Sequence, residues 1–165
     1  MDKRLQDKIW RLNNLYKIRD KKGKLIQFKL NRAQAHYHVH KWFRNLILKS
    51  RQLGFTTYEA IDSLDDALFT PNMDALMIAH NLEAGESIFT KKIAFAWDKL
   101  GEPIKQLYTV DNKTSKTLKF DFGEKGFSSV AVDTSGRSGT YQRVHITELA
   151  EISKKYPKKV PDIIE

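Results

Sequence analysis

Hydrophobic residues recur along this chain at the two spacings that distinguish helices from strands. Near the start they lie three or four residues apart among charged residues, at Leu5, Ile9, Leu12 and Tyr16. This spacing predicts an amphipathic helix over residues 2–15. Two short apolar stretches on either side of the sequence KKGK then predict a β-hairpin. Residues 1–30 are therefore interpreted as an extension, made of one helix and one hairpin, that precedes the main domain.

The main domain, residues 31–165, alternates helical and strand patterns. Helices are predicted over residues 32–44, 56–69, 82–100 and 149–156, and strands over residues 46–49, 75–80 and 143–147, with two or three more strands between residues 107 and 132. The run LILK is typical of a buried parallel strand. Strands that alternate with helices predict an α/β domain with a largely parallel sheet flanked by helices.

Composition narrows the class of protein. The chain has 165 residues, of which 41% are hydrophobic, and this size suits one domain with a full core. It has no cysteine, which excludes disulfides and zinc–thiolate sites. No apolar run approaches the roughly 20 residues that span a bilayer, and the first residues do not form a secretory signal, so we expect a soluble intracellular protein.

Lysine and arginine total 29 against 20 acidic residues, a formal net charge of +9. This excess favours a polyanionic partner such as nucleic acid, because basic side chains that neutralise phosphates release bound counterions. A well-solvated basic surface is the simpler alternative.

The sequence LILKSRQLGFTT places a loop between an apolar run and a helix start. This order is typical of a phosphate-binding loop, in which backbone N–H groups at the helix start point at the anion. In the common pattern G-x-x-x-x-G-K-[ST], a lysine precedes the hydroxyl residue. Gly54 and Thr56 match that pattern, but Phe55 stands in the place of the lysine and Lys49 in the place of the first glycine. Lys49 and Arg51 offer positive charge from the start of the loop instead.

The sequence VHITE contains a second candidate site. An ATPase needs acidic or hydroxyl groups at the end of a neighbouring buried strand, where they hold Mg²⁺ and polarise water. Thr147 is the candidate on the metal side, and Glu148 is the candidate catalytic carboxylate. Each motif has a simpler interpretation, since Gly-Phe-Thr-Thr is a common helix start and Glu148 complements the dipole of the next helix. The two motifs together favour an ATP site.

In three motifs, the chain resembles the large subunit of the terminase from tailed bacteriophages. KSRQLGFTT resembles that family's variant phosphate loop, FKLNRAQAHYH resembles its adenine-contacting segment, and SGRSGTYQRVHITELAEI resembles the stretch that leads into its acidic strand. The motifs occur in the order found in the family and span residues from about 25 to 152. The resemblance implies a P-loop NTPase of the RecA-like fold, in the class with an additional strand between the two ATP motifs. The implied activity is ATP hydrolysis that moves double-stranded DNA into a procapsid.

The resemblance also implies roles for individual residues, with ATP and Mg²⁺ as the cofactors. Gln34 would contact adenine, Glu148 would orient the attacking water, and Arg137 would reach the γ-phosphate held by a neighbouring subunit. Thr56 and Thr147 would hold Mg²⁺, the latter through water. The implied ATP-binding set is Gln34, Lys49, Ser50, Arg51, Gln52, Leu53, Gly54, Phe55, Thr56 and Thr57.

The implied partners are double-stranded DNA, the terminase small subunit, the portal and other copies in a homo-oligomeric ring, in the cytoplasm of an infected bacterium and away from membranes. Complete members of the family continue into a coupling motif and a nuclease domain. This sequence stops before them, so we expect a truncated ATPase core with little turnover and no nuclease activity. Two alternatives stay open: a silent module that binds nucleotide or DNA, and a helicase-like or recombination ATPase core.

Overall fold

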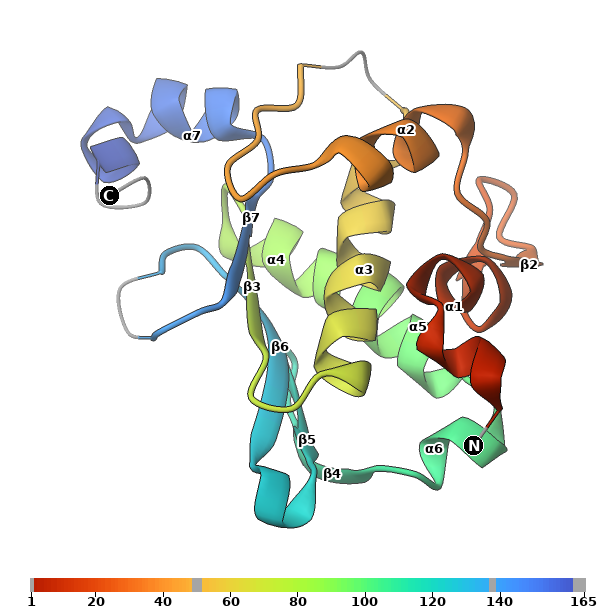
Figure 1. Cartoon of the computed structure of the whole chain (residues 1–165). Coiled ribbons are helices and arrows are strands. Elements are labelled where there is room, and N and C mark those ends of the chain that lie inside the picture. The colour runs from red at the N-terminus through yellow and green to blue at the C-terminus, as the bar shows by residue number, and fades with distance from the viewer. Residues whose placement is uncertain (1, 49–51, 137–138, 162–165) are drawn as a thin grey trace.

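A five-stranded sheet forms the centre of the computed structural model, which describes residues 2–48, 52–136 and 139–161. Its strands are β3 (Asp74–Ile78), β4 (Thr109–Lys113), β5 (Thr117–Asp121), β6 (Phe127–Asp133) and β7 (Arg143–Ile146). They lie side by side in the order β4-β5-β6-β3-β7 (Figure 1). The three strands β6, β3 and β7 are parallel, whereas β5 is antiparallel to both of its neighbours. The predicted α/β class is confirmed, and the sheet is mixed rather than largely parallel.

Most helices lie within the segments predicted to be helical. They are α1 (Lys8–Asn14), α2 (Arg32–His40), α3 (Phe55–Phe69), α4 (Leu82–Ile88), α5 (Phe95–Asp98), α6 (Glu102–Lys105) and α7 (Leu149–Lys155), with short 3-10 turns at Lys3–Gln6, Gly123–Lys125 and Pro157–Lys159. A π-helical segment, η2 (Phe89–Ala94), joins α4 to α5, so the predicted helix at residues 82–100 contains a widened turn. No helix among the described residues combines the length and apolar character needed to cross a membrane.

The strands alternate their side chains between two unequal apolar layers. Ala75 and Met77 of β3 face the main core, which α3 and the α4–α5 helix cover. Leu76 and Ile78 face a smaller cluster on the other side of the sheet, where Ile152 of α7 packs. Figure 1 shows α3 and α7 on opposite faces of the sheet.

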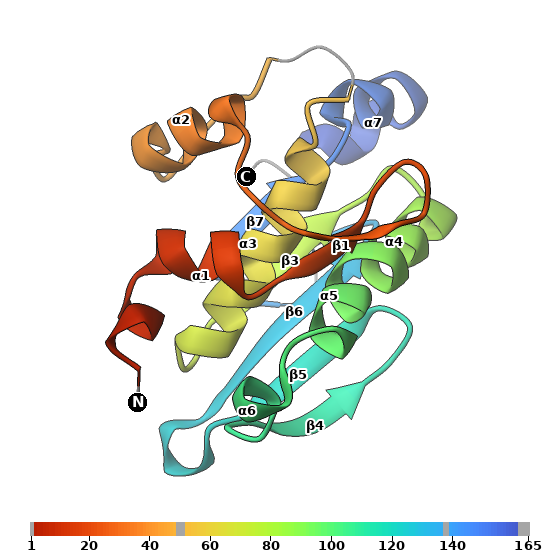
Figure 2. The same cartoon turned by 90° about the vertical axis from the view of Figure 1, so that its right-hand side faces the viewer.

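The N-terminal extension forms a third layer outside α3. Its predicted hairpin is present as β1 (Lys17–Arg19) and β2 (Leu25–Gln27), which pair antiparallel. Figure 2 shows α1 and this hairpin lying over α3 and the α4–α5 helix, on the side away from the sheet. Leu12 and Tyr16, two of the four residues that predicted the first helix, are fully buried there.

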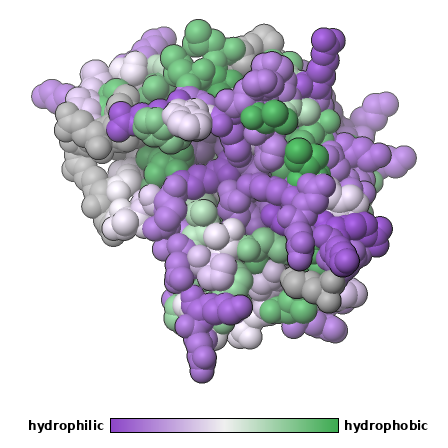
Figure 3. All heavy atoms as spheres, in the orientation of Figure 1, coloured by the Kyte–Doolittle hydropathy of each residue, from purple (hydrophilic) through white to green (hydrophobic). Residues whose placement is uncertain are grey.

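The segment between α2 and α3 departs from prediction. The helix predicted over residues 32–44 ends at His40, and residues 41–48 contain neither helix nor strand. Trp42 is 76% exposed and Leu48 is 88% exposed, so the predicted buried strand at LILK is wrong over its described residues. In Figure 3 apolar atoms gather at the top of the molecule, over this segment. A buried strand needs a hydrogen-bonded neighbour. In the described sheet the edge strand β7 pairs only with β3, so residues 46–48 do not add a strand beside it.

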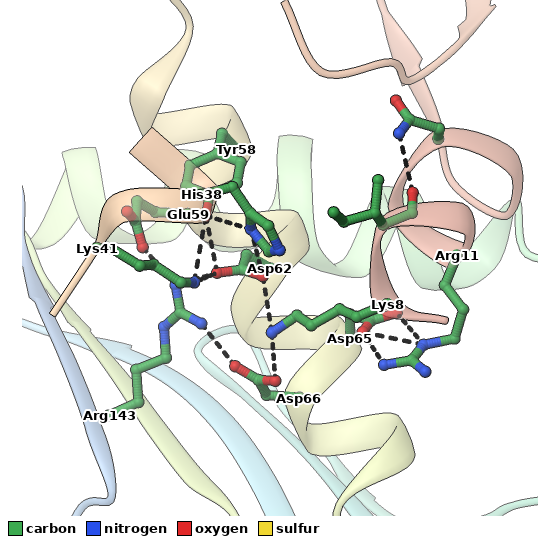
Figure 4. A network of polar contacts seen from close by, with 12 residues as sticks. Lys8, Arg11, His38, Lys41, Tyr58, Glu59, Asp62, Asp65, Asp66 and Arg143 are labelled. Carbon is green, nitrogen blue, oxygen red and sulfur yellow. Dashed lines mark hydrogen bonds and ion pairs between the residues drawn. The ribbon is translucent and has the colours of Figure 1, made fainter. Parts of the chain in front are cut away.

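The polar face of α3 is buried as well, because cations from three other segments cover it (Figure 4). Asp62 is fully buried, with its carboxylate 2.8 Å from Lys8 Nζ, 2.5 Å from Lys41 Nζ and 2.5 Å from the Arg143 guanidinium. Burial opposes the ionisation of Asp62, but these three positive charges outweigh it and hold the pKa of Asp62 well below its usual value. One carboxylate on α3 therefore joins α1, the segment after α2 and β7.

A second buried carboxylate fixes α1 on α3. Arg11 Nη2 donates to Asp65 Oδ2 at 2.7 Å, and Arg11 Nε approaches both Asp65 oxygens at 3.0 and 3.1 Å. The Tyr16 hydroxyl donates to Asp65 Oδ1 at 2.7 Å. Burial raises the pKa of Tyr16 well above its usual value, and the Asp65 charge adds to the effect. The extension is thus held by specific polar contacts in addition to apolar packing.

Candidate functional site

The carboxyl ends of two parallel strands bring His80 and Glu148 together. Strands β3 and β7 pair with Ile78 opposite Ile146, so the residues two positions further along also meet. His80 Nδ1 lies 3.0 Å from Glu148 Oε2. The Glu148 backbone has a φ of 56°, in the left-handed region that is uncommon for residues other than glycine and is often found at functional sites. Its side chain is 64% exposed, so a histidine orients a carboxylate that still faces solvent.

The first turn of α3 lies at the same end of the molecule (Figure 1). Gly54 precedes it with a φ of 71°, and a Cβ added to Gly54 would stand 2.9 Å from Gln34 Nε2. Glycine has no side chain with which to cap the helix, and the first turn contains no acidic residue. The N–H groups of this turn have no partner within the helix, and the helix dipole adds partial positive charge there. The start of α3 therefore favours an anion.

A pocket of about 520 Å³ joins these two features. Its lining residues are Gln52, Gly54, Phe55, Thr56, Thr57, Lys92 and Glu148. The volume lies in the usual range for small-molecule sites, and the position at the carboxyl ends of parallel strands is where ligands bind in open α/β sheets. The structure thus brings the second half of the predicted phosphate loop together with the predicted catalytic carboxylate.

Phe55 lines the pocket, but its ring packs in the core. It is buried and meets the rings of Tyr37 and Tyr58 edge-on, with centroids 5.5 and 6.2 Å away. The position that carries lysine in the common phosphate loop therefore serves packing in this chain. Positive charge for a bound anion therefore has to come from a residue other than the one at position 55.

Gln34 fixes the backbone of the loop through hydrogen bonds. Its Nε2 donates to the carbonyl oxygens of Leu53 and Gly54, both at 3.1 Å, and its Oε1 accepts from Asn31 N at 3.1 Å. Gln34 is buried and does not line the pocket. The structure therefore gives its amide a role in fixing the Leu53–Gly54 backbone, and contact with adenine stays a prediction.

Of the other predicted site residues, some line the pocket, some do not, and some lie outside the described part of the chain. Thr147 is buried, its hydroxyl donates to the Ile78 carbonyl at 3.1 Å, and it does not line the pocket. Thr56 and Thr57 do line the pocket. Four predicted residues lie outside the described part of the chain: Lys49, Ser50, Arg51 and Arg137.

The donor set of the pocket fits magnesium better than a tightly held structural metal. Over residues 2–48, 52–136 and 139–161, no three His, Asp or Glu side chains gather as a metal site. Mg²⁺ usually keeps several waters and binds substrate phosphates together with one or two protein oxygens. The Thr56 hydroxyl and the Glu148 carboxylate are oxygen donors of this kind on the walls of one pocket. They would hold the ion only together with a phosphate ligand.

Lys92 is a functional candidate that the sequence motifs did not identify, as is His80. It lies on the π-helical segment η2, and its Nζ donates to Thr57 Oγ1 at 2.8 Å. The available signal was its helical phase, because Ile88, Phe89 and Phe95, three or four residues away, are all apolar. A cation on the apolar side of a helix is unusual enough to mark a candidate.

No protein family model matches this chain, and no curated protein matches it either. The residues that line the pocket are therefore the basis for assigning a ligand. Three features of the pocket limit the ligand: a helix start without an acidic residue, a partly buried lysine, and a carboxylate whose partner is a histidine. This combination suits a ligand with several negative charges and a reactive centre near Glu148.

Proposed function

We propose that this chain binds ATP with Mg²⁺ in the pocket between the first turn of α3 and Glu148. The observation that carries the proposal is the lining of this pocket, which combines loop residues, the Thr56 hydroxyl and a cation with one carboxylate. The triphosphate would lie along the helix start, where N–H groups and the dipole favour an anion. Thr56 would contribute its hydroxyl to Mg²⁺, which bridges phosphate oxygens.

The same geometry supports hydrolysis. Glu148 Oε2 interacts with His80, which leaves Oε1 available to accept a hydrogen bond from a water molecule. A water held there could attack the terminal phosphorus, and the bond to the bridging oxygen of the leaving ADP would break. Positioning and charge stabilisation account for most of the catalysis in such phosphoryl transfers. We therefore propose that the chain is an ATPase.

More specifically, we propose that the chain is the ATPase module of a viral DNA-packaging terminase large subunit. The motif resemblance and the net charge of +9 support it. Double-stranded DNA is then expected to stimulate hydrolysis, with a stimulation that falls as salt rises because phosphate contacts release counterions. Stimulation by single-stranded DNA alone would favour a helicase-like ATPase and contradict the packaging role.

Binding without turnover is the second candidate function. The observation that favours it is the exposed segment before the loop, where Leu46 and Leu48 do not join the sheet. In a fully assembled phosphate-loop fold, a strand delivers the loop to the helix. Hydrolysis above background by a purified preparation, lost in a Glu148 variant, would exclude this candidate.

The binding proposal predicts a thermal shift. Ligand at about 100 times its Kd stabilises the folded state by about 2.7 kcal/mol, which corresponds to roughly 5–10 °C for a domain of this size. We expect Mg²⁺-ATP to raise the melting temperature by that amount. Thr56→Val should remove the part of the shift that depends on Mg²⁺, because it loses the hydroxyl and keeps the side-chain shape.

The matched control is Thr109→Val, an exposed threonine on β4 far along the chain from the loop. It should melt with the same ATP and Mg²⁺ dependence as the original chain. An unchanged melting temperature of the original chain at saturating Mg²⁺-ATP would refute the proposed function.

A further inference from the structure

Lys92 lines the pocket. Among the described residues, it has no carboxylate partner. Its Nζ donates a hydrogen bond to Thr57 Oγ1, at 2.8 Å. Burial lowers the pKa of Lys92, and the charge of Lys91 lowers it further. A partly buried ammonium group normally finds an anion, because an unpaired charge away from water costs free energy. The pocket thus contains a cation whose surroundings favour an added negative charge.

Lys92 and Glu148 line the same pocket, but each has a different partner. Glu148 Oε2 lies 3.0 Å from His80 Nδ1, whereas Lys92 Nζ bonds to a hydroxyl of α3. An ion pair between them would neutralise the pocket. With separate partners, the wall formed by Lys92 and the helix start stays positive, and the wall formed by Glu148 stays negative. This division suits phosphate on the first wall and water on the second.

The helix that carries Lys92 changes its geometry at this point. Residues Phe89–Ala94 form a π-helical segment, in which hydrogen bonds span five residues instead of four. Such widened turns inside α-helices are frequently found at functional sites. Ile93 and Ala94 on the same segment are buried in the core, so the position of Lys92 is fixed by packing on the adjacent side of the helix.

We propose that Lys92 is the cation that binds the terminal phosphates of the nucleotide, in the role that Phe55 cannot fill. This inference rests on the proposed function and extends it, because it assigns the missing phosphate-loop lysine to a helix far from the loop in sequence. The ammonium group would donate to a phosphate oxygen and keep its contact with Thr57, since it has three hydrogens to donate. It would hold the triphosphate against the first turn of α3, with the reactive end toward Glu148.

The test compares Lys92→Met with Lys91→Met, which removes the same charge from the exposed neighbouring lysine. Equilibrium binding of ATP and of inorganic triphosphate would be measured for each variant at one salt concentration. A hydrogen bond to a charged group is worth about 1.5–3 kcal/mol, so Lys92→Met should weaken both ligands by about 10- to 100-fold. Lys91→Met should change them by less than about 3-fold, as expected for an exposed charge. Lys92→Arg should restore most of the loss, because it keeps a cation in the pocket.

A parallel titration with a short DNA duplex separates two sources of phosphate. We expect the affinity for DNA to fall equally in Lys91→Met and Lys92→Met, because each substitution removes one positive charge. Loss of DNA binding in Lys92→Met with intact triphosphate binding would assign Lys92 to DNA and overturn the inference.

The outcomes also distinguish this inference from the proposed function. If the original chain binds ATP and Lys92→Met binds it equally well, the inference fails and the ATP site stands. If the original chain binds neither ATP nor inorganic triphosphate, the proposed function fails and the inference fails with it. If Lys92→Met loses ATP binding while its melting temperature in the absence of ligand is unchanged, the inference is supported independently of folding.

Discussion

Glu148→Gln is expected to lower kcat for ATP hydrolysis about 100- to 10,000-fold, the range associated with a positioned general base. Glutamine keeps the size of the side chain and can still bond to His80, but it cannot carry the negative charge that orients and activates water. The affinity for Mg²⁺-ATP should stay within a few-fold of the original, because the proposed triphosphate contacts are the first turn of α3 and Lys92, and not Glu148. Steady-state hydrolysis and equilibrium nucleotide binding, measured on the same preparation, check both parts.

The control for that experiment is Glu151→Gln, which alters an exposed carboxylate of α7 that pairs with Lys155. It changes the same residue type three positions away and should leave kcat unchanged. Equal hydrolysis by Glu148→Gln and the original chain would remove Glu148 from the catalytic site. An equal loss in Glu151→Gln would show that the effect comes from α7 as a whole.

Arg143→Met is expected to destabilise the fold by about 3–5 kcal/mol, the cost of removing one partner from a buried ion pair. The Arg143 guanidinium lies 2.6 Å from Glu59 Oε2, 2.5 Å from Asp62 Oδ2 and 2.6 Å from Asp66 Oδ2 (Figure 4). Methionine replaces the stem of the side chain but leaves carboxylates facing one another with less positive charge nearby. Urea denaturation at neutral pH gives the change in the free energy of unfolding.

Lys155→Met tests whether any lost ion pair has this effect. Lys155 pairs with Glu151 on the exposed side of α7, where solvent screens the interaction. Its denaturation midpoint should match that of the original chain. A loss of less than about 1 kcal/mol in Arg143→Met, the range of surface ion pairs, would contradict the structural role assigned to the buried network.

Helix and strand patterns predicted most elements because they depend on local spacing. Residues 56–69 were predicted as a helix from their periodicity, and α3 spans Phe55–Phe69. The strand predicted at residues 75–80 is present as β3, with its alternating sides buried against two apolar layers. These elements were predictable because the residues that define each pattern also make the buried contacts.

The strand predicted just before the loop is absent, and the reason does not lie in the local sequence. LILK has the composition of a buried strand, but composition cannot show whether a neighbouring strand offers a free hydrogen-bonding edge in the right place. Leu46 and Leu48 are exposed in the structure. Trp42 and Phe43 are exposed as well, and they lie beyond His40, where the helix predicted over residues 32–44 ends.

The candidate site was predictable only in part. Gly54, Thr56 and Glu148 were identified from their local motifs, and all three line one pocket. Lys92 and His80 were missed because their relevance depends on how distant segments pack. The buried polar network was not predicted for the same reason, because its acidic residues lie on α3 and their cationic partners come from distant segments such as α1 and β7.

The other proposed roles all depend on whether Mg²⁺-ATP binds in the pocket at the start of α3. The most direct test is a nuclear magnetic resonance titration of the isotope-labelled chain, which follows each backbone amide as Mg²⁺-ATP is added. We expect the largest shifts at Gly54, Thr56, Thr57 and Glu148, with little change in the hairpin of β4 and β5. Saturable shifts confined to another surface, or no shifts at all, would contradict binding in this pocket.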